Sequence, residues 1–258
     1  MAVRTALVTG ATAGLGAAFV RRLAADGYHL VLVARGGERL AEMAEEVAGR
    51  YGVTATPMVA DLSTDEGCAA VEERLRDPAA PIDLLVNNAG RTLNTAFVRS
   101  TAEKEASLLR LNVDAVMRLT LAALPTMIER RQGAVVNVSS VSGFFAVMPG
   151  STYPASKAWV TNFTQSVALS VRRYGVRVMV LCPGYTRTEF HERAGIDESK
   201  IPGWLWLDAD AVVRDGLRDL RRGKIVSIPT WKYKVLVAVG RHAPLRLVGR
   251  VSRDTRGR

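Results

Sequence analysis

The segment 151–159, STYPASKAW, places Tyr153 and Lys157 four residues apart, directly after a break marked by proline and glycine. In a helix, residues at this spacing lie on the same face, and the ammonium group then favours ionisation of the phenol. The pKa of free tyrosine is about 10, so a proton shuttle near neutral pH needs a pKa of roughly 7 to 8, a change worth about 3 to 4 kcal/mol. Such a pair also arises by chance, so its meaning depends on the rest of the chain.

Short apolar runs alternate along the chain with longer amphipathic stretches, which is typical of strand–helix units around a parallel sheet. One such stretch, residues 37–52, carries an apolar stripe that includes Leu40 and Val47 and predicts a helix. Crossover handedness then predicts an α/β fold, a single Rossmann-like doubly wound parallel sheet flanked by helices. The predicted strands are TALVTG, YHLVLVA, VTATPMV, IDLLVNN, GAVVNVS, VRVMVLC and KIVSIP.

Directly after the first predicted strand comes TGATAGLG, residues 9–16, which opens into an apolar helix. A dinucleotide-binding fold has its phosphate loop at this place. Gly10 allows a tight turn, Gly14 lets backbone N–H groups approach a pyrophosphate, and Gly16 lets the helix pack close to the strand. The spacing is GxxxGxG and not GxGxxG, and a glycine triplet alone is often only a flexible turn.

The end of the second predicted strand carries the residue that selects the adenosine ribose. An acidic residue there favours NAD(H), but the chain has Ala34 followed by Arg35. A guanidinium can bind a 2′-phosphate, so NADP(H) is favoured over NAD(H); the alternative is a solvated charge. Asp61, after the third strand, is predicted to accept the adenine amino group, or else to cap a helix, a role that suits Ser63 better.

These motifs together resemble the short-chain dehydrogenases/reductases, in their compact single-domain branch. The resemblance covers roughly residues 3–228, in the family's order and spacing. The motifs that carry it are TGATAGLG, VADL, NNAG (87–90), LNV around Asn112, VVNVSS ending at Ser140, YPASK and CPGYTRT (182–188).

The resemblance implies an oxidoreductase that interconverts a ketone and a secondary alcohol. Tyr153 would be the general acid or base, and Lys157 would lower its pKa and hold the nicotinamide ribose. Ser140 would bind the substrate oxygen, and Asn112 would anchor a water that links Lys157 to solvent. These roles agree with a reaction that leaves charge on one oxygen and brings a proton to it.

The resemblance also implies which residues bind the cofactor. Thr186, through its backbone, and Thr188, through its hydroxyl, would fix the carboxamide. Ala13 stands where many relatives have Ser or a basic residue, and Arg91, after NNAG, is an unusual charge near the nicotinamide. The full implied set is Gly10, Thr12, Ala13, Gly14, Leu15, Gly16, Arg35, Asp61, Leu62, Asn88, Ala89, Gly90, Tyr153, Lys157, Pro183, Gly184, Thr186 and Thr188.

The segments expected to form the substrate pocket are rich in apolar residues. This favours a lipophilic carbonyl, such as a steroid, fatty-acyl, polyketide or aromatic ketone, over a sugar, unless half of these residues belong to the core or to a subunit contact. Two alternatives stay open: a noncatalytic nucleotide-sensing or scaffold protein, and a nucleotide-sugar epimerase, for whose C-terminal sugar domain the chain is short. The residues in question are Phe97, Phe144, Phe145, Met148, Phe190, Trp204, Leu205 and Trp206.

The net charge of +10 belongs to the end of the chain, because residues 218–258 carry 12 Lys+Arg against 2 Asp+Glu. We expect a dinucleotide-binding catalytic domain at 1–229 and a basic amphipathic helical tail at 230–258, an extension and not a separate domain. The tail packs on its own or a partner subunit, or lies on an anionic membrane; nucleic acid is the least favoured partner.

Other features set the expected surroundings of the protein. The N-terminus resembles neither a signal peptide nor a membrane span, so we expect a cytoplasmic protein, with association to a membrane through the tail as the alternative. Cys68 and Cys182 are interpreted as structural thiols, and the three scattered histidines predict no metal site. The family's habit predicts a homodimer or homotetramer that pairs through helices around 112–131 and 153–173.

Overall fold

The computed structural model describes residues 4–93, 95–145, 152–190 and 201–242. Its core is one parallel sheet of seven strands in the order β3-β2-β1-β4-β5-β6-β7, so the strand order reverses between β1 and β4. The predicted doubly wound sheet is therefore confirmed, and each predicted run contains one strand. The strands are β1 Thr5–Thr9, β2 His29–Ala34, β3 Ala55–Val59, β4 Leu84–Asn87, β5 Gly133–Val138, β6 Val176–Leu181 and β7 Val226–Ser227.

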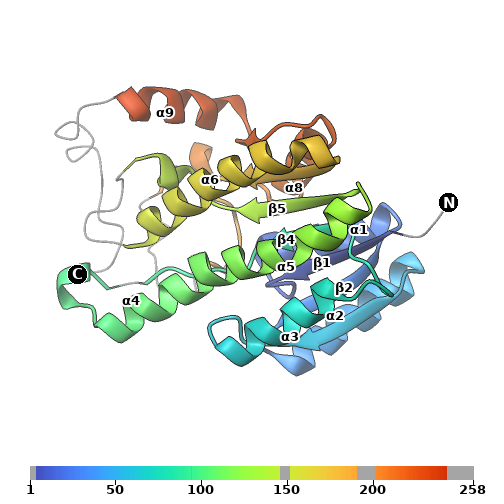
Figure 1. The fold of residues 1–258 in the computed structure, drawn as a ribbon. Coiled ribbons are helices and arrows are strands. Elements are labelled where there is room, and N and C mark those ends of the chain that lie inside the picture. The colour runs from blue at the N-terminus through green and yellow to red at the C-terminus, as the bar shows by residue number, and fades with distance from the viewer. Residues whose placement is uncertain (1–3, 94, 146–151, 191–200, 243–258) are drawn as a thin grey trace.

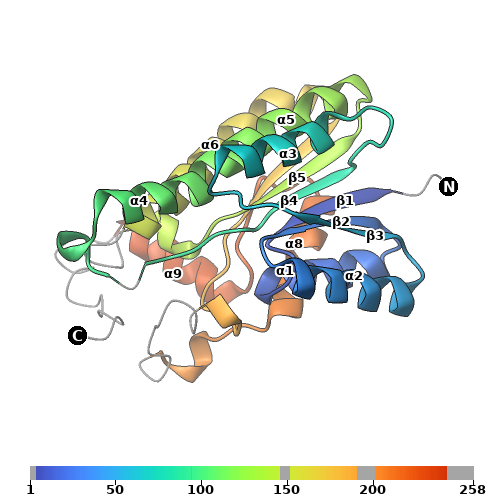
Figure 2. The ribbon, with the colours of Figure 1, turned by 90° about the horizontal axis from the view of Figure 1, so that it is seen from below.

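Helices cover both faces of the sheet (Figures 1 and 2), and each face has its own apolar cluster. Helices α1, α2 and α8 pack on one face, while α3, α5 and α6 pack on the other. The α-helices are α1 Gly14–Ala25, α2 Gly37–Tyr51, α3 Asp65–Arg76, α4 Ala102–Leu109, α5 Ala115–Glu129, α6 Thr152–Val171, α8 Ala209–Arg221 and α9 Trp231–His242. Shorter helical turns are η1 Phe97–Arg99, η2 Arg110–Asp114, η3 Val141–Phe144, η4 Arg172–Tyr174 and η6 Gly203–Leu205.

The amphipathic stretch at 37–52 forms α2, as its apolar stripe predicted. Leu40, Ala44 and Val47 are its buried residues, and the helix ends at Gly52, whose φ of +67° is a left-handed conformation that glycine adopts without strain. Helix α3 begins differently from the prediction. Its N-cap is Thr64, whose hydroxyl accepts a hydrogen bond from Gly67 N, and not Ser63.

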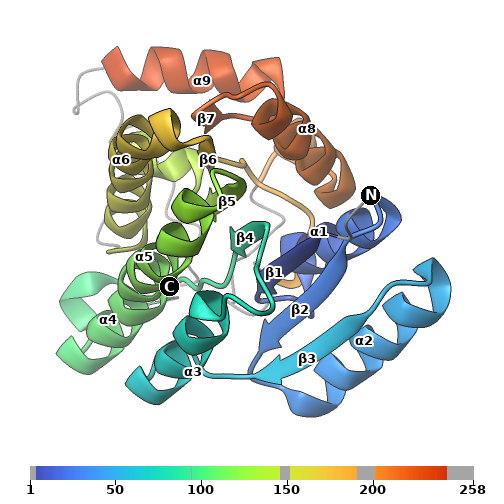
Figure 3. The ribbon, with the colours of Figure 1, turned by 45° about the vertical axis from the view of Figure 1, so that its right-hand side comes forward.

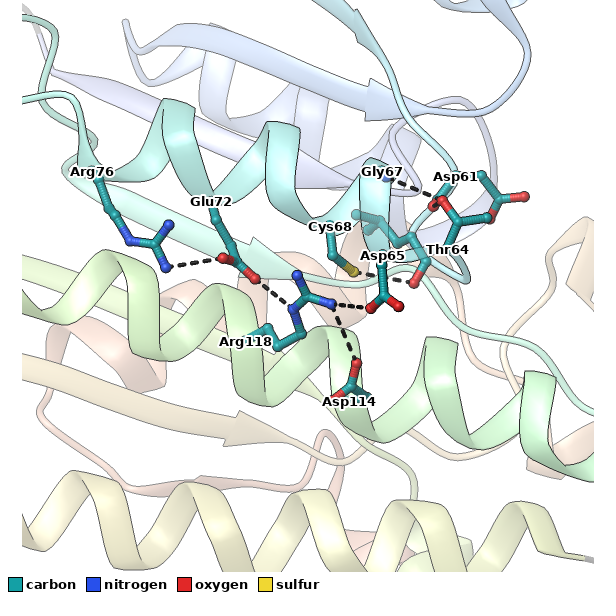
Figure 4. Close-up of polar contacts among 10 residues, drawn as sticks. Asp61, Thr64, Asp65, Gly67, Cys68, Glu72, Arg76, Asp114 and Arg118 are labelled. Carbon is teal, nitrogen blue, oxygen red and sulfur yellow. Dashed lines mark hydrogen bonds and ion pairs between the residues drawn. The ribbon is translucent and has the colours of Figure 1, made fainter.

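Ion pairs fix α3 against α5 (Figure 4). The Arg118 guanidinium of α5 donates to Glu72 and to Asp65 of α3, and Asp114 lies 3.9 Å from it. These hydrogen bonds raise the pKa of Arg118 and lower that of Glu72 against the effect of its burial. The pairs hold in place the helix that follows the η2 turn.

The helical run Ala102–Glu129, which joins α4, η2 and α5, is apolar and long enough to cross a membrane by length and composition alone. In this fold its side chains Leu119, Ala122 and Met127 are buried against the sheet. We therefore interpret the run as a core helix. The η2 turn inside it is a π-helix, a local irregularity that frequently marks a functional site.

Helix α9 lies across the β7 end of the sheet, next to α6 and α8 (Figure 3). It buries only Tyr233 and Val237, which are one turn apart, while Trp231, Val235 and Val239 are exposed. Part of the segment predicted as a tail therefore packs on the catalytic body. Residues 243–258 lie outside the described residues.

Candidate active site

The site lies where the strand order reverses, at the carboxyl ends of β1 and β4, the usual ligand position in an open parallel sheet. The Thr9 hydroxyl accepts hydrogen bonds from the backbone N–H groups of Asn88 and Ala89, each at 3.0 Å. The Asn88 side chain donates in return to Thr9 O at 2.9 Å. These bonds join the glycine loop to the NNAG segment.

The glycine loop uses its three glycines for three different reasons. Gly10 and Gly14 have φ values of +65° and +53°, which favour glycine. A Cβ on Gly14 would lie 3.0 Å from Thr188 Cβ, so the loop passes close to the segment after β6. A Cβ on Gly16 would lie 1.9 Å from Gly10 O, so the first turn of α1 can pack against the loop only if residue 16 has no side chain.

The start of α1 has the properties of an anion-binding helix terminus. Its N-cap is Ala13, no side chain caps the helix, and its first turn contains no acidic residue. By contrast, Thr64, Thr101 and Asp208 cap α3, α4 and α8 with side-chain oxygens. The first N–H groups of α1 therefore suit a phosphate, which fits a dinucleotide.

Arg35 and Asp61 lie together at the carboxyl ends of β2 and β3, with 3.9 Å between Arg35 Nη1 and Asp61 Oδ2. Asp61 also accepts from Ser63 N at 2.9 Å and from Ser63 Oγ at 2.7 Å. Burial raises the pKa of Asp61, but the bonds from Ser63 and the charges of Arg35 and Arg91 outweigh it and lower the pKa overall. The group is a carboxylate at neutral pH.

The chemical centre lies at the end of β5. Ser140 follows this strand, and its hydroxyl accepts from Ser142 N at 3.1 Å and interacts with the Tyr153 phenol. Lys157 lies one turn further along α6, with its Nζ 5.7 Å from the centroid of the Tyr153 ring. The Lys157 ammonium donates to Val138 O at 2.9 Å.

The pKa of Tyr153 differs from the expectation. Burial raises it to about 12, and the hydrogen bond to Ser140 only partly opposes that rise. Burial also lowers the pKa of Lys157 to about 8. The Lys157 ammonium is directed at a backbone carbonyl and lies over the face of the Tyr153 ring, so burial of the phenol outweighs the nearby charge.

Asn112 lies in the η2 π-helix and holds the backbone of Arg91. Its Nδ2 donates to Arg91 O at 2.8 Å and to Ser156 Oγ at 3.2 Å, and its Oδ1 accepts from Arg91 N at 2.9 Å. A Cβ on Gly90 would lie 3.3 Å from Asn112 Oδ1 and 3.4 Å from Lys157 Nζ. The π-helix therefore brings Asn112, NNAG and the lysine together.

Tyr233 of α9 belongs to the site, and the sequence analysis missed it. Its hydroxyl accepts from Tyr185 N at 3.0 Å and donates to Leu205 O at 2.8 Å. A Cβ on Gly184 would lie 1.9 Å from Tyr233 Cζ, so the ring lies directly against this glycine. Its position one turn before Val237 in an amphipathic pattern was the available signal, but the basic charge of the segment led to its interpretation as a tail.

Aromatic side chains of the predicted substrate pocket lie near Tyr153 and Tyr185. The Tyr153 and Phe190 rings lie 5.9 Å apart, and so do the Tyr185 and Trp206 rings. Phe97 and Trp204 are 57% and 56% exposed, so they are not enclosed by this chain. Met148 lies outside the described residues.

Some of the residues that the resemblance assigns to cofactor binding also stabilise the fold. The Leu62 side chain is buried in the core, and the Pro183 carbonyl accepts from Val141 N at 3.0 Å. Both cysteines are buried free thiols, and burial raises the pKa of Cys68 to about 11 and that of Cys182 to about 12.

Comparison with known proteins gives a consistent result. The family profile for short chain dehydrogenase matches residues 4–199. The chain is 36% identical over 190 residues to the oxidoreductase UcpA of Escherichia coli strain K12, which covers 73% of this chain and 72% of that protein.

Two solved structures are similar over nearly the whole chain. A short-chain dehydrogenase from Sphingobium yanoikuyae in complex with NADPH is 37% identical, with a TM-score of 0.85 and coverage of 92% of this chain and 93% of the other. The bulky-bulky ketone specific alcohol dehydrogenase from Comamonas testosteroni is 31% identical, with a TM-score of 0.81 and coverage of 96% and 91%.

Proposed function

Since the chain belongs to the short-chain dehydrogenase/reductase family and is an oxidoreductase, we propose that it interconverts a lipophilic ketone and its secondary alcohol with NADP(H). The observation that carries this proposal is the position of Ser140, Tyr153 and Lys157 at the end of β5, beside the glycine loop and NNAG. A proton donor and the proposed nucleotide-binding loop therefore lie together at the carboxyl ends of the strands.

The glycine loop would hold the pyrophosphate, and Lys157 the nicotinamide ribose. Thr186 and Thr188 would fix the carboxamide, and the bonds from Thr186 Oγ1 to Gly184 O and from Thr188 Oγ1 to Thr186 O keep this segment folded back towards Gly14. When bound, the nicotinamide supplies or accepts the hydride.

NADP(H) is proposed over NAD(H) because of Arg35. Its side chain is 70% exposed and its only ion pair among the described residues is the 3.9 Å contact with Asp61, so it can turn to a 2′-phosphate. The similar Sphingobium yanoikuyae enzyme is a complex with NADPH, which supports the choice.

The chain's own residues would carry the proton. In ketone reduction the Tyr153 hydroxyl donates its proton to the substrate oxygen while the carbonyl carbon gains a hydride, and Ser140 donates a hydrogen bond to the same oxygen. Burial raises the pKa of Tyr153 to about 12, so the phenol carries its proton at neutral pH and can donate it. The tyrosinate that results would be stabilised by Lys157 and regain its proton through Lys157 and the water that Asn112 would anchor.

The aromatic residues near Tyr153 support the proposed substrate class, since Phe190 contacts Tyr153 and Trp206 contacts Tyr185. Apolar surface from Phe190, Tyr185 and Trp206 lies near the hydroxyls of Tyr153 and Ser140. Such surroundings suit a bulky or aromatic ketone better than a sugar. The similar Comamonas testosteroni enzyme is specific for bulky-bulky ketones, in agreement with this choice. A homodimer or homotetramer through α5 and α6 is part of the proposal, and the exposed Leu121 and Leu169 of these helices support it.

A fluorescence titration with NADPH and NADH, followed by a screen of bulky aromatic and alicyclic ketones, tests the proposal. We expect NADPH to bind more tightly than NADH and to be oxidised when such a ketone is added. Equal binding of the two would overturn the NADP(H) assignment alone. Folded protein that binds neither cofactor would overturn the proposed function.

A further inference from the structure

Helix α9 has two faces with opposite surroundings. Tyr233 and Val237 are 4% and 5% exposed and face the body, whereas Trp231, Val235 and Val239 are 71%, 52% and 65% exposed. The three exposed residues are spaced by four, so they share one side of the helix, opposite the buried stripe. We call Trp231, Val235 and Val239 the α9 outer face.

Cations flank the α9 outer face, and acidic residues are missing from the helix. Lys232 and Lys234 are exposed, Arg241 lies in the last turn of α9, and the helix sequence WKYKVLVAVGRH contains no Asp or Glu. Lys232 Nζ lies 6.0 Å from the centroid of the Trp204 ring, which is itself 56% exposed on η6. An exposed tryptophan of the substrate side therefore extends the apolar surface beyond α9.

We propose that the α9 outer face and Trp204 dock the protein on a bilayer that contains anionic lipids. Tryptophan rings and long lysine side chains suit the boundary between headgroups and acyl chains, because the apolar part enters while the polar end stays wet. A helix with an apolar outer stripe and basic flanks lies in the plane of this boundary. The charge of residues 218–258, 12 Lys+Arg against 2 Asp+Glu, favours an anionic surface.

The inner face of α9 links this surface to the site. Tyr233 contacts Gly184, Tyr185 and Leu205, and a Cβ on Gly240 would lie 2.7 Å from the Phe145 ring. Docking would thus hold the substrate side close to the membrane, where a lipophilic ketone concentrates. This last step rests on the proposed function, whereas the docking itself does not.

Flotation of the full-length protein with vesicles tests the docking. One vesicle is phosphatidylcholine alone and the other also contains phosphatidylglycerol. We expect the wild type to float only with the anionic vesicles and to be released by salt. The double variant Val235→Ser/Val239→Ser should bind at least tenfold more weakly, and so should Lys232→Glu/Lys234→Glu, while Val98→Ser, which changes a residue 88% exposed on η1, should bind like the wild type.

Three outcomes would overturn the docking proposal. The wild type could stay unbound with anionic vesicles, the Val235→Ser/Val239→Ser variant could float as well as the wild type, or this variant could change the subunit number in solution, which would assign the outer face to a second copy of the chain. NADPH oxidation with a water-soluble ketone, measured on each variant, separates loss of docking from failure of the proposed function.

Discussion

The cofactor side and the substrate side of the site are built by different means. On the cofactor side, short polar contacts join the glycine loop to the NNAG segment, such as Thr9 with Asn88, 79 residues away, and close backbone packing joins Gly10 to Gly16. On the substrate side, Tyr185, Leu205 and Tyr233 meet from three separate segments through one hydroxyl and one ring. The first side therefore depends on backbone packing and polar contacts of the glycine loop, whereas the second depends on the ring and the hydroxyl of one residue, Tyr233.

The largest effect is expected where the two sides meet, at Tyr153. The Tyr153→Phe variant keeps the buried ring but has no proton to donate, so turnover of a ketone should fall by about 10² to 10⁴-fold. NADPH binding should stay within about twofold of the wild type, because the ring and Lys157 remain in place. Steady-state NADPH oxidation and a fluorescence titration measure both quantities, and turnover at the wild-type rate would refute the acid role.

Gly16→Ala tests the tightness of the cofactor side. The added Cβ would lie 1.9 Å from Gly10 O, so the loop or α1 must move. We expect NADPH to bind about 100-fold more weakly, since the phosphate cradle depends on this packing. Gly36→Ala is the matched control, because no atom lies within 4 Å of its added Cβ, and it should bind NADPH normally. Equal affinity of the two variants would show that the loop is not tightly packed.

Substitutions of two arginines distinguish binding of the 2′-phosphate, which only NADP(H) has, from binding of the part that both cofactors share. Arg35→Ala should weaken NADPH binding about 10- to 100-fold and leave NADH binding unchanged, because a hydrogen-bonded ion pair contributes about 1.5 to 3 kcal/mol.

Arg91 lowers the pKa of Asp61, and its buried Nε has no hydrogen-bond partner among the described residues. Arg91→Met should therefore weaken NADPH and NADH alike, by about tenfold or less. Titration of both variants with both cofactors measures these affinities. If Arg91→Met binds NADH as tightly as the wild type does, Arg91 does not belong to the cofactor side.

A smaller effect is expected on the substrate side from Tyr233→Phe. The ring would still cover Gly184, but the hydroxyl contacts to Tyr185 N and Leu205 O would be lost, at about 0.5 to 1.5 kcal/mol each. We expect the KM for the ketone to rise about three- to tenfold with NADPH affinity unchanged. Tyr28→Phe, which changes a residue at the amino end of β2, should leave both constants unchanged. A Tyr233→Phe variant that loses NADPH affinity instead would place Tyr233 on the cofactor side.

The smallest effect concerns the pH dependence of stability. Lys157 has a pKa of about 8 when folded and 10.5 in its unperturbed state, so from pH 8 upwards the unfolded chain binds a proton that the native protein lacks, and stability rises by at most about 1.4 kcal/mol per pH unit. As the pH reaches 9 this gain is offset, because Cys68 and Cys182 have pKa values of about 11 and about 12 against 9, so the native protein keeps protons that the unfolded chain loses. Urea unfolding at pH 7, 8, 9 and 10 should show the rise between pH 8 and 9, and Lys157→Met should not. A rise of equal size in the variant would exclude Lys157 as its source.

The sheet and the cofactor side were predictable from the sequence because local patterns determine them. Apolar runs at regular spacing gave the seven strands, and Gly10, Gly14 and Gly16 occupy places where only glycine fits. Tyr233 was not predicted as a site residue, because no motif contains it and its contacts with Leu205 and Tyr185 lie 28 and 48 residues away. The pKa of Tyr153 was predicted in the wrong direction, because burial depends on the packing of the whole fold.

The most direct test of the central claim follows the hydride and the proton together. The protein is incubated with NADPH that carries deuterium at both positions of C4 and with a bulky aromatic ketone, and the alcohol is analysed by mass spectrometry. The account predicts one deuterium on the carbinol carbon with the wild type, and almost none with Tyr153→Phe over the same time. An unlabelled alcohol, no alcohol, or equal labelling by the two proteins would contradict it.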